Sequence, residues 1–224
     1  EILQSDPSMS TRGNAAQALG KIGLAAGSAV PALIEFLLGQ EGGIERAYAA
    51  TALGSIKQSP HTVVPALAKA LSTSDNQVVR QLAARALGDF GADARPAGPE
   101  LIDAIKSGDK ELRDAASDAI TTIPPTIKDL PLSLPLLNDQ VDSVRLAACA
   151  SIGRAGPDGL AAVPALVKLL TESNINVRAA AAKALGAIGP GAKSALPVLK
   201  KAQKDSQIAA VVSQAIKDIK HSQH

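Results

Sequence analysis

The chain has 224 residues and a net charge of +2, and 46% of its residues are apolar although only three are aromatic. This composition is too apolar and too weakly charged for an intrinsically disordered chain, and a single cysteine excludes a disulfide framework or a cysteine-rich metal site. No apolar run approaches the roughly 20 residues of a membrane-spanning helix, and the shortage of aromatic residues disfavours a platform on which bases could stack.

A segment of one pattern recurs along the chain at an almost constant spacing. Each copy has an Arg, then small residues, and then an aliphatic anchor seven positions after the Arg. In chain order the anchors are Leu19, Leu53, Leu87, Ile120, Ile152, Leu185 and, in a weaker copy that lacks the Arg, Ile216. Successive anchors are 34, 34, 33, 32, 33 and 31 residues apart. A period of this kind indicates a stack of repeats, each of which is one supersecondary unit.

A second pattern, a Pro followed by an aliphatic segment, precedes each of the later copies. The prolines are Pro31, Pro65, Pro99, Pro131, Pro164 and Pro197. Proline is favoured in the first turn of a helix, and the apolar residues after it recur at helical spacing, as at Leu33, Phe36 and Leu37. We therefore predict that each repeat consists of a short helix A, which starts near the Pro, and a longer helix B, which carries the anchor.

Small residues recur at three positions relative to the anchor. The alanines four positions before it are Ala49, Ala83, Ala116, Ala148 and Ala181, and the glycines directly after it are Gly20, Gly54, Gly88, Gly153 and Gly186. A Gly inside a helix costs about 1 kcal/mol relative to Ala, so we expect the next helix to approach closely there. The glycines four positions after the anchor, Gly23, Gly91, Gly156 and Gly189, suit left-handed caps at the end of helix B.

The pattern V-R-x-x-A-A-x-A-L-G-x-I-G resembles that of HEAT repeats, of a short bacterial kind similar to the repeats of phycobilisome lyase HEAT-like proteins. Val177–Gly189 matches it almost letter for letter, whereas Ile120–Pro125 and Ala209 depart from it. The resemblance implies an all-α, right-handed α-solenoid of about six to seven two-helix repeats over residues 1–224. The expected repeats are 1–25, which is truncated, then 26–58, 59–92, 93–125, 126–157, 158–190 and the C-terminal cap 191–224.

The Arg of each copy is the most conspicuous charged feature. The six residues are Arg12, Arg46, Arg80, Arg113, Arg145 and Arg178. One interpretation is a basic stripe for phosphate or an acidic partner. The other, which the resemblance also implies, is a structural ladder in which each Arg pairs with a residue of the turn before helix B that caps the helix. The turn residues are Glu41, Asp75, Asp109, Asp142 and Asn174, and we favour the structural interpretation.

No residues with catalytic or metal-binding spacing occur in the sequence. His61, in an expected turn, and His221 and His224, in the tail, have no Cys or carboxylate at ligand spacing. Cys149 lies in an Ala-rich segment typical of a core helix. The acidic turns Asp75–Asn76 and Asp139–Asp142 suit helix capping better than calcium binding. We expect no enzymatic activity, no cofactor and no metal.

The partner-binding surface is expected on the concave side, where helix B positions −6, −2 and +2 relative to the anchor point away from the core. Residues in these rows vary from repeat to repeat, and the −6 row begins with Gly13 and Ala47. The candidates on this side are Tyr48, Gln81, Arg85, Asp89, Asp114, Asp118, Arg154 and Lys183. Tyr48 stands where other copies have smaller or aliphatic residues, which leaves open whether it anchors a partner or fills a gap.

Charge is distributed unevenly along the chain. Residues 93–143 contain ten acidic and five basic residues, a net charge of −5, and residues 191–224 contain six Lys and two Asp, a net charge of +4. This asymmetry suits oriented contacts with a partner and equally suits an ordinary solvated surface.

The repeat pattern breaks at Ile123–Leu137, which contains Pro124, Pro125, Pro131 and Pro135. Pro135 falls inside the expected helix A of the fifth repeat, where proline removes a hydrogen bond and clashes with the preceding turn. We therefore predict a shortened or kinked helix. A hinge, a docking surface and a tolerated irregularity all remain open as interpretations of the break.

These observations favour a non-catalytic scaffold or adaptor that binds another protein of unknown identity. One alternative is a chaperone or lyase-like subunit that acts on a chromophore protein. Another is nucleic-acid binding, which the shortage of aromatics and the lack of a continuous basic face disfavour. Self-association through the solenoid ends is a further expectation. One Cys and no signal segment favour the cytoplasm, while the missing initiator Met leaves a processed or truncated, exported or periplasmic protein open.

Overall fold

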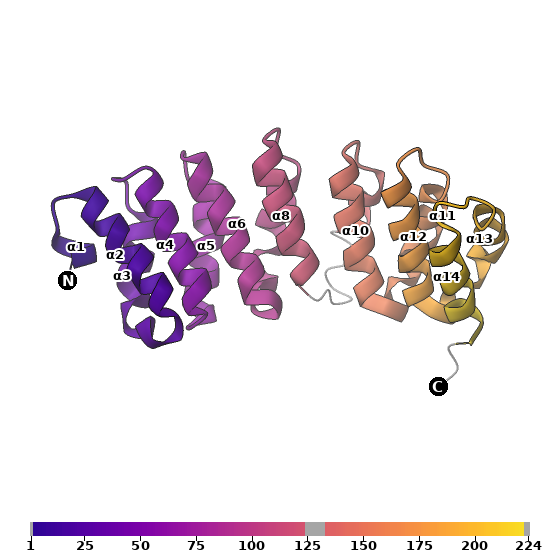
Figure 1. The fold of residues 1–224 in the computed structure, drawn as a ribbon, viewed down its shortest axis with the longest axis horizontal. Coiled ribbons are helices and arrows are strands. Elements are labelled where there is room, and N and C mark those ends of the chain that lie inside the picture. Colours follow the sequence, from indigo (N-terminus) through magenta and orange to yellow (C-terminus); the bar gives the residue numbers. More distant parts are fainter. Residues whose placement is uncertain (1, 124–132, 222–224) are drawn as a thin grey trace. The chain divides into compact units, whose positions relative to one another are not determined.

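The computed structural model describes residues 2–123 and 133–221, which form helices and turns without a β-strand. The chain divides into two compact units, Glu1–Ile123 and Pro124–His224. The prediction of an all-α fold built from repeated helix pairs is confirmed (Figure 1). The expectation of one continuous solenoid over residues 1–224 stays a prediction.

The first unit contains four pairs of helices A and B among its described residues. The pairs are α1 (Ile2–Ser5) with α2 (Met9–Ile22), α3 (Val30–Leu38) with α4 (Ile44–Ile56), α5 (Pro60–Thr73) with α6 (Gln77–Phe90), and α7 (Gly98–Ile105) with α8 (Lys110–Thr122). The 3-10 helices η1 (Gly23–Ala29) and η2 (Gly91–Ala97) connect one pair to the next. Each B helix packs against the following one, and Figure 1 shows α2, α4, α6 and α8 side by side.

Among its described residues, the second unit repeats this arrangement three times. Its elements are η3 (Pro135–Asn138) with α10 (Asp142–Ala155), α11 (Val163–Leu169) with α12 (Ile175–Ile188), and α13 (Leu196–Ala202) with α14 (Ala209–His221), joined by η4 (Gly156–Ala162) and η5 (Gly189–Ala195). The B helices α10, α12 and α14 again pack one against the next. Both units are therefore built by the same nearest-neighbour stacking.

The core of each unit lies between its A and B helices. Leu53, Leu87 and Leu185, the anchors of complete repeats, are fully buried, as are Leu33 and Leu37 of α3. The alanines at position −4 are buried as well, which keeps neighbouring B helices close. The first anchor, Leu19, is only half-buried, because the short α1 covers little of α2.

The glycines inside helix B mark the closest approach of neighbouring B helices, as predicted. A Cβ added to Gly20, Gly88 or Gly186 would lie 3.0, 3.1 or 2.9 Å from the Cα of Ala52, Ala119 or Ala215 on the next B helix. No side chain fits at such a distance from backbone without a shift of the helices. These glycines therefore set the spacing between repeats.

The glycines at the ends of the B helices have positive φ, as predicted, but are not left-handed helical caps. Gly23, Gly91, Gly156 and Gly189 have φ between 52° and 71° with ψ between −121° and −140°. This ψ is far from the value near +45° of the left-handed helix. The chain leaves helix B in an extended turn that leads directly into the 3-10 connection.

The prediction that the third helix A starts near Pro65 is wrong. Helix α5 begins at Pro60, so Pro65 lies inside it and His61 lies in its first turn rather than in a loop. The connection from α4 is a tight turn in which Lys57 and Ser59 have positive φ, and it replaces the 3-10 helix found in other repeats. Pro65 has no N–H group, so the carbonyl of His61, an exposed residue, lacks its usual helical partner.

The proline-rich break is described only in part. Pro124, Pro125 and Pro131 lie outside the described residues. Pro135 lies in the first turn of η3, a 3-10 helix of four residues, where the other repeats of this unit have an α-helix of seven. The described part of the break therefore ends in a short 3-10 helix, and the shortening or kinking of the whole expected helix A stays a prediction.

One stretch corrects the expectation that no segment has the composition of a membrane span. Met9–Leu38 is long and apolar enough by composition, with a mean hydropathy of 1.5 over its most apolar 18 residues. In the structure this stretch bends at Gly23 and comprises α2, η1 and α3. The longest of these, α2, has 14 residues, or about 21 Å against the roughly 30 Å of a bilayer core.

Candidate partner-binding surface

Two rows of B-helix residues point outward in both units, as the sequence predicted. The −2 row consists of Gln17, Thr51, Arg85, Asp118, Ala150, Lys183 and Gln214, and all seven are exposed. The +2 row consists of Lys21, Ser55, Asp89, Thr122, Arg154, Ala187 and Asp218, of which only Asp218 is half-buried. We call these two rows together the B-helix face. Its residues differ in charge and size from repeat to repeat, whereas the residues beneath them are uniformly small or aliphatic.

The −6 row does not belong to this face throughout. Gly13 and Ala47 are buried, and Gln81 and Asp114 are half-buried. A Cβ on Gly13 would lie 3.0 Å from the Cβ of Glu45 and 3.2 Å from Cδ2 of Tyr48. The side chains of α4 therefore cover Gly13, because the next helix lies directly over this position in the first repeats.

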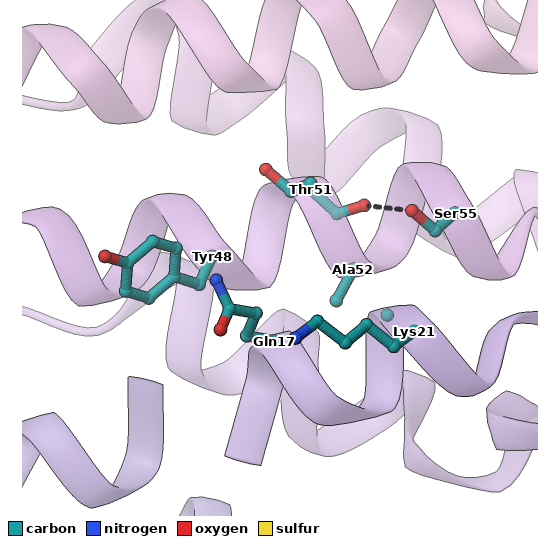
Figure 2. A pocket seen from close by; sticks show the side chains of 7 residues that line it. Gln17, Lys21, Tyr48, Thr51, Ala52 and Ser55 are labelled. Atoms are coloured by element: carbon teal, nitrogen blue, oxygen red, sulfur yellow. Dashed lines mark hydrogen bonds between the residues drawn. The ribbon is translucent and has the colours of Figure 1, made fainter. Parts of the chain in front are cut away.

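Tyr48 both fills a gap and lines the surface. Its ring packs over Gly13 of the neighbouring helix and is half-buried. Tyr48 also lines a hollow of about 320 Å³ between α2 and α4 (Figure 2). The hollow is lined by Gln17, Gly20, Lys21, Tyr48, Thr51, Ala52 and Ser55, and we call it the Tyr48 hollow.

The Tyr48 hollow owes its shape to the glycine spacing. Its floor is the contact between Gly20 and Ala52, where neither residue has a long side chain. Ser55 turns its hydroxyl back to donate to the carbonyl of Thr51 at 3.1 Å, as the dashed line in Figure 2 shows. Sequence reasoning missed this hollow. The available signal was the coincidence of a bulky Tyr48 with two glycines, Gly13 and Gly20, in the preceding repeat.

Some of the polar residues predicted to form a patch on α6 and α8 bond to other side chains of the unit, and others do not. Gln81 donates from Nε2 to Oδ1 of Asp109 at 3.5 Å, and Asp114 pairs with Nζ of Lys110 at 2.7 Å. Arg85 and Asp118 are exposed, and no ion pair joins Arg85 to Asp89 or Asp118 in the part of the chain that the structure describes. These exposed charges are consequently presented outward rather than used within the unit.

Asp89 is held against the neighbouring helix. Its Oδ2 would lie 2.8 Å from a Cβ on Gly54 of α4, so the carboxyl group rests on a glycine. Burial there raises the pKa of Asp89 above its ordinary value, and attraction to Lys57 lowers it in part. Thr122 occupies the same position one repeat later, where its hydroxyl donates to the carbonyl of Gly88 at 2.9 Å.

Arg154 and Lys183 lie in the second unit, on α10 and α12. Both are exposed, and burial of part of the Arg154 side chain lowers the pKa of its guanidinium group. The predicted candidates therefore do not form one patch within a single unit. Arg85, Asp89 and Asp118 belong to the B-helix face of the first unit, and Arg154 and Lys183 to that of the second. Tyr48 is in neither row, but it lies beside Thr51 and Ser55 of this face in the Tyr48 hollow.

The Arg ladder is hydrogen-bonded to backbone in both units. Nε donates nine residues back in Arg12, Arg46 and Arg80, to the carbonyls of Leu3, Leu37 and Leu71 at 2.6, 3.1 and 2.8 Å. Nη1 donates six residues back in Arg113, Arg145 and Arg178, to the carbonyls of Ser107, Asp139 and Glu172 at 2.9, 2.5 and 2.8 Å. Each Arg therefore ties helix B to the end of its own helix A or to the A–B turn. These bonds support the structural interpretation over a basic stripe.

Three of these residues also reach the next repeat. Arg46 donates to the hydroxyl of Ser74 at 3.2 Å and lies 3.9 Å from Asp75, and Arg178 pairs with Asp205 at 2.9 Å. The guanidinium of Arg12 lies 4.6 Å above the ring of Phe36. Arg145 instead pairs with Asp142 of its own repeat.

The capping prediction holds at two of its five positions. Asp109 and Asn174 cap α8 and α12 by accepting from backbone N–H groups. In α6 the cap is Asn76 rather than Asp75, and α4 and α10 begin after Gly43 and Val141 without a side-chain cap. Glu41, Asp75 and Asp142 lie one or two residues away from the capping position, which leaves Asp75 and Asp142 to pair with Arg side chains.

The described residues contain no cluster with the make-up of a metal site. No cluster of three His, Cys, Asp or Glu side chains that could hold a metal occurs among them, and His224 lies outside them. Cys149 is buried in α10, and this burial raises the pKa of its thiol to about 12. A thiol in that environment is a packing residue and a poor nucleophile at neutral pH.

Comparison with protein families gives two matches. A family model described as HEAT repeats matches residues 30–121 and 130–219, which is well over half of the chain. A model described as a PBS lyase HEAT-like repeat matches residues 11–39. No curated protein matches the chain.

Solved structures of similar fold include natural and designed repeat proteins. An engineered protein is 23% identical with a TM-score of 0.65, and the match covers 97% of the present chain and 66% of that protein. A designed armadillo repeat protein in complex with the peptide (KR)4 is 19% identical with a TM-score of 0.64, over 85% and 99% of the two chains. The complex of CpcE and CpcF of phycocyanin lyase from Nostoc sp. PCC7120 is 26% identical with a TM-score of 0.53, over 97% and 91%.

Proposed function

The chain belongs to the HEAT repeat family, and from that premise we propose that it is a non-catalytic scaffold or adaptor that binds another protein through its B-helix face. The observation that carries this proposal is the exposure of all seven residues of the −2 row. They lie on a backbone whose spacing is held constant by glycine and alanine contacts. A rigid scaffold with variable outward residues loses little conformational entropy when a partner binds.

In the first unit, the B-helix face combines a hollow with several charged side chains. The Tyr48 hollow provides a semi-apolar depression with Lys21 at its edge, and α6 and α8 present Arg85, Asp89 and Asp118. Protein-binding surfaces are enriched in aromatic residues at their core and have a polar rim. The designed armadillo repeat protein in complex with the peptide (KR)4 shows that a repeat protein of similar fold binds a peptide.

Affinity capture from a native extract tests this proposal. The wild-type chain, Arg85→Ala and Asp118→Ala are compared with Lys106→Ala and Asp103→Ala, which change exposed residues at the end of α7 and within it. We expect a captured protein to be lost or at least about tenfold depleted with the first two variants and retained with the two controls, since a buried charged hydrogen bond contributes roughly 1.5–3 kcal/mol. Capture that is unaffected by Arg85→Ala and Asp118→Ala would place the partner elsewhere.

A second candidate function is that of a chaperone or lyase-like subunit for a chromophore protein. The match of residues 11–39 to the PBS lyase HEAT-like repeat and the likeness to the CpcE–CpcF complex favour it. If the protein has this function, the pigment would contact the Tyr48 hollow, because the lining of this hollow combines an aromatic ring with Lys21 and Gln17. Titration of the protein with a linear tetrapyrrole tests it: a saturable shift of the pigment absorbance that Tyr48→Ala abolishes would favour this function over simple scaffolding.

Nucleic-acid binding is not proposed. Asp89 and Asp118 interrupt the exposed rows of the first unit with negative charge, whereas a phosphate-tracking surface needs a continuous basic stripe.

A further inference from the structure

One side of α2, the first B helix of the first unit, has the residues of a contact between helices but is left open by the described residues (Figure 1). Ala18, one position before the anchor, is exposed, and Ile22, three positions after it, is 58% exposed. The anchor Leu19 and Ala15 are only half-buried. These four residues lie at helical spacing on one side of α2, and we call them the α2 end face.

The corresponding residues are buried wherever one B helix follows another within a unit. The residue one position before the anchor is then an Ala that is at most 2% exposed, and the residue three positions after the anchor is a buried Ile or Phe. The alanines are Ala52, Ala86, Ala119, Ala184 and Ala215, and the larger residues are Ile56, Phe90, Ile123, Ile188 and Ile219. The α2 end face therefore has the residue types that the other B helices bury.

A glycine of the preceding B helix makes each of these contacts. A Cβ added to the glycine after the anchor would lie 2.9–3.3 Å from the Cα of the alanine on the next helix, and this holds for Gly20, Gly54, Gly88, Gly153 and Gly186. In three of the five contacts, the glycine three residues further on comes within 3.7–4.0 Å of a backbone carbonyl of the next helix, again measured from an added Cβ; these are Gly23, Gly91 and Gly156. The helix that covers such a face therefore typically has two glycines three residues apart.

The last B helix described, α14, is built differently on its outer side. Lys217 takes the place of the contact glycine, and Lys220 takes the place of the glycine three residues later. Both lysines are exposed, and a polar outer face of this kind keeps a terminal repeat soluble. The α2 end face contains no charged residue. A second copy of this chain could not cover it with α14 in the same register, because Lys217 has a Cβ where the contact requires glycine.

We propose that the α2 end face is a docking surface for an α-helix of a partner protein, which packs parallel to α2 in the manner of a preceding B helix. The partner helix would place one glycine against the backbone of Ala18 and a second, three residues later, beside the carbonyl of Lys21. These are the atoms that correspond to the contacts within the chain. Aliphatic side chains of the partner would cover Leu19 and Ile22.

The occupant follows from the interface that this surface continues. Within the first unit, α2 packs against α4, α4 against α6, and α6 against α8, each time through the same positions. Because small residues at these positions let two backbones approach closely, a helix with glycine at the contact fits them, and a helix with larger side chains there does not. The surface is separate from the B-helix face and does not depend on the function proposed for that face.

The test uses the full chain, labelled with 15N, and a peptide that copies residues 163–189. The peptide contains a helix A and a helix B, so that its B helix has a partner for its core side, and it includes Gly186 and Gly189. We expect saturable shifts of the amide signals of Ala15, Ala18 and Ile22. The same peptide with Gly186→Leu should bind at least about tenfold more weakly, because the added side chain meets the backbone of α2.

Ala18→Gln is the decisive variant. Ala18 is exposed and Gln is a good helix former, so the variant should fold like the wild type. We expect it to lose the saturable shifts, whereas Ala150→Gln, the same change at an exposed position of α10, retains them. The proposal is overturned if the peptide does not shift these signals in the wild type, or if Ala18→Gln or the Gly186→Leu peptide binds equally well.

Sedimentation of the chain alone distinguishes a second copy from a separate partner. We expect the wild-type chain to show no dimer that depends on the α2 end face. A concentration-dependent dimer that Ala18→Gln abolishes and Ala150→Gln leaves intact would assign the face to a second copy and would overturn the proposal of a separate partner helix.

Discussion

The carboxyl group of Asp89 in α6 rests on Gly54 in α4, with Oδ2 at 2.8 Å from the position that a Cβ on Gly54 would take. The same pair of helices is in backbone contact, because that Cβ would also lie 3.1 Å from the Cα of Ala86. The contact at Gly54 therefore sets both the spacing of these two repeats and the position of the outward-facing Asp89 carboxyl group. Corresponding contacts recur between Gly88 and Thr122 and between Gly186 and Asp218.

Gly54→Ala is expected to destabilise the first unit. The added methyl group has no room beside the backbone of Ala86, so α4 and α6 must separate, and overpacking of this kind costs about 1–3 kcal/mol. The gain of roughly 1 kcal/mol in helix propensity offsets part of that cost. Urea unfolding followed by circular dichroism measures the net change. Gly108→Ala is the matched control: nothing lies within 4 Å of its added Cβ, so its free energy of unfolding should stay within about 0.5 kcal/mol of wild type or rise slightly.

Asp89→Asn is expected to raise stability at neutral pH and to lose this advantage in acid. The folded state raises the pKa of Asp89, so between the unfolded and folded pKa values it binds more protons than the unfolded state does. Stability contributed by this group is therefore highest at low pH and decreases as pH rises through that window, which begins near pH 4. Unfolding curves of the two proteins at pH 7 and pH 3.5 check the sign. A variant less stable than wild type at pH 7 would show that attraction to Lys57 outweighs burial.

Arg46→Ala should be among the more damaging substitutions in the Arg ladder. Arg46 is only 8% exposed, donates to the carbonyl of Leu37, and reaches Ser74 of the next repeat. Its removal leaves buried groups without partners, so we expect a loss of about 2–4 kcal/mol in the free energy of unfolding. Arg85→Ala makes the same chemical change at an exposed position and should cost no more than about 0.5 kcal/mol. Equal losses in the two variants would contradict a structural role for the ladder.

Asp75→Asn should have little effect on stability. Its partner atom in Arg46 lies 3.9 Å away, and the Asp75 side chain is 95% exposed. An ion pair in that setting contributes between zero and about 1 kcal/mol. Thermal unfolding at low and high salt measures it, and a salt-sensitive loss well above that range would show that the pair matters more than its exposure suggests.

The thiol of Cys149 should be unreactive in the folded protein. Burial raises its pKa to about 12, so only a very small fraction is thiolate at pH 7.5, and the side chain is shielded in α10. Ellman's reagent should therefore react slowly with the native protein and stoichiometrically, with one thiol per chain, in guanidinium chloride. Fast reaction without denaturant would show that α10 opens locally.

Tyr48 is the sole tyrosine of the chain, so a label on tyrosine reports on the Tyr48 hollow alone. Incorporation of 3-fluorotyrosine places a single 19F resonance at Tyr48, which is half-buried beside Gly13. If a partner covers the B-helix face of the first unit, this resonance should shift and broaden when the partner is added. A resonance that is unchanged at saturating partner would assign the contact to another surface.

The periodic pattern predicted most of the fold, because in a repeat each unit meets chiefly its neighbour. The anchors at Leu53, Leu87 and Leu185 and the glycines after them could be assigned from spacing alone. The outward −2 and +2 rows followed from helical geometry, since positions two residues to either side of a buried anchor point away from it. The start of α5 could not be obtained in this way, because the turn through Lys57 and Ser59 differs from the 3-10 connection of other repeats.

The sequence by itself thus determined the repeat, the helix pairs and the direction in which most B-helix residues point. Only the tertiary structure decided which of those residues the next repeat covers, as it covers Gly13 with Tyr48, and where hollows remain between helices. The physical reason is that spacing along the chain reports the period of packing, whereas the contacts at any one point depend on side chains that come from different repeats and meet only in three dimensions.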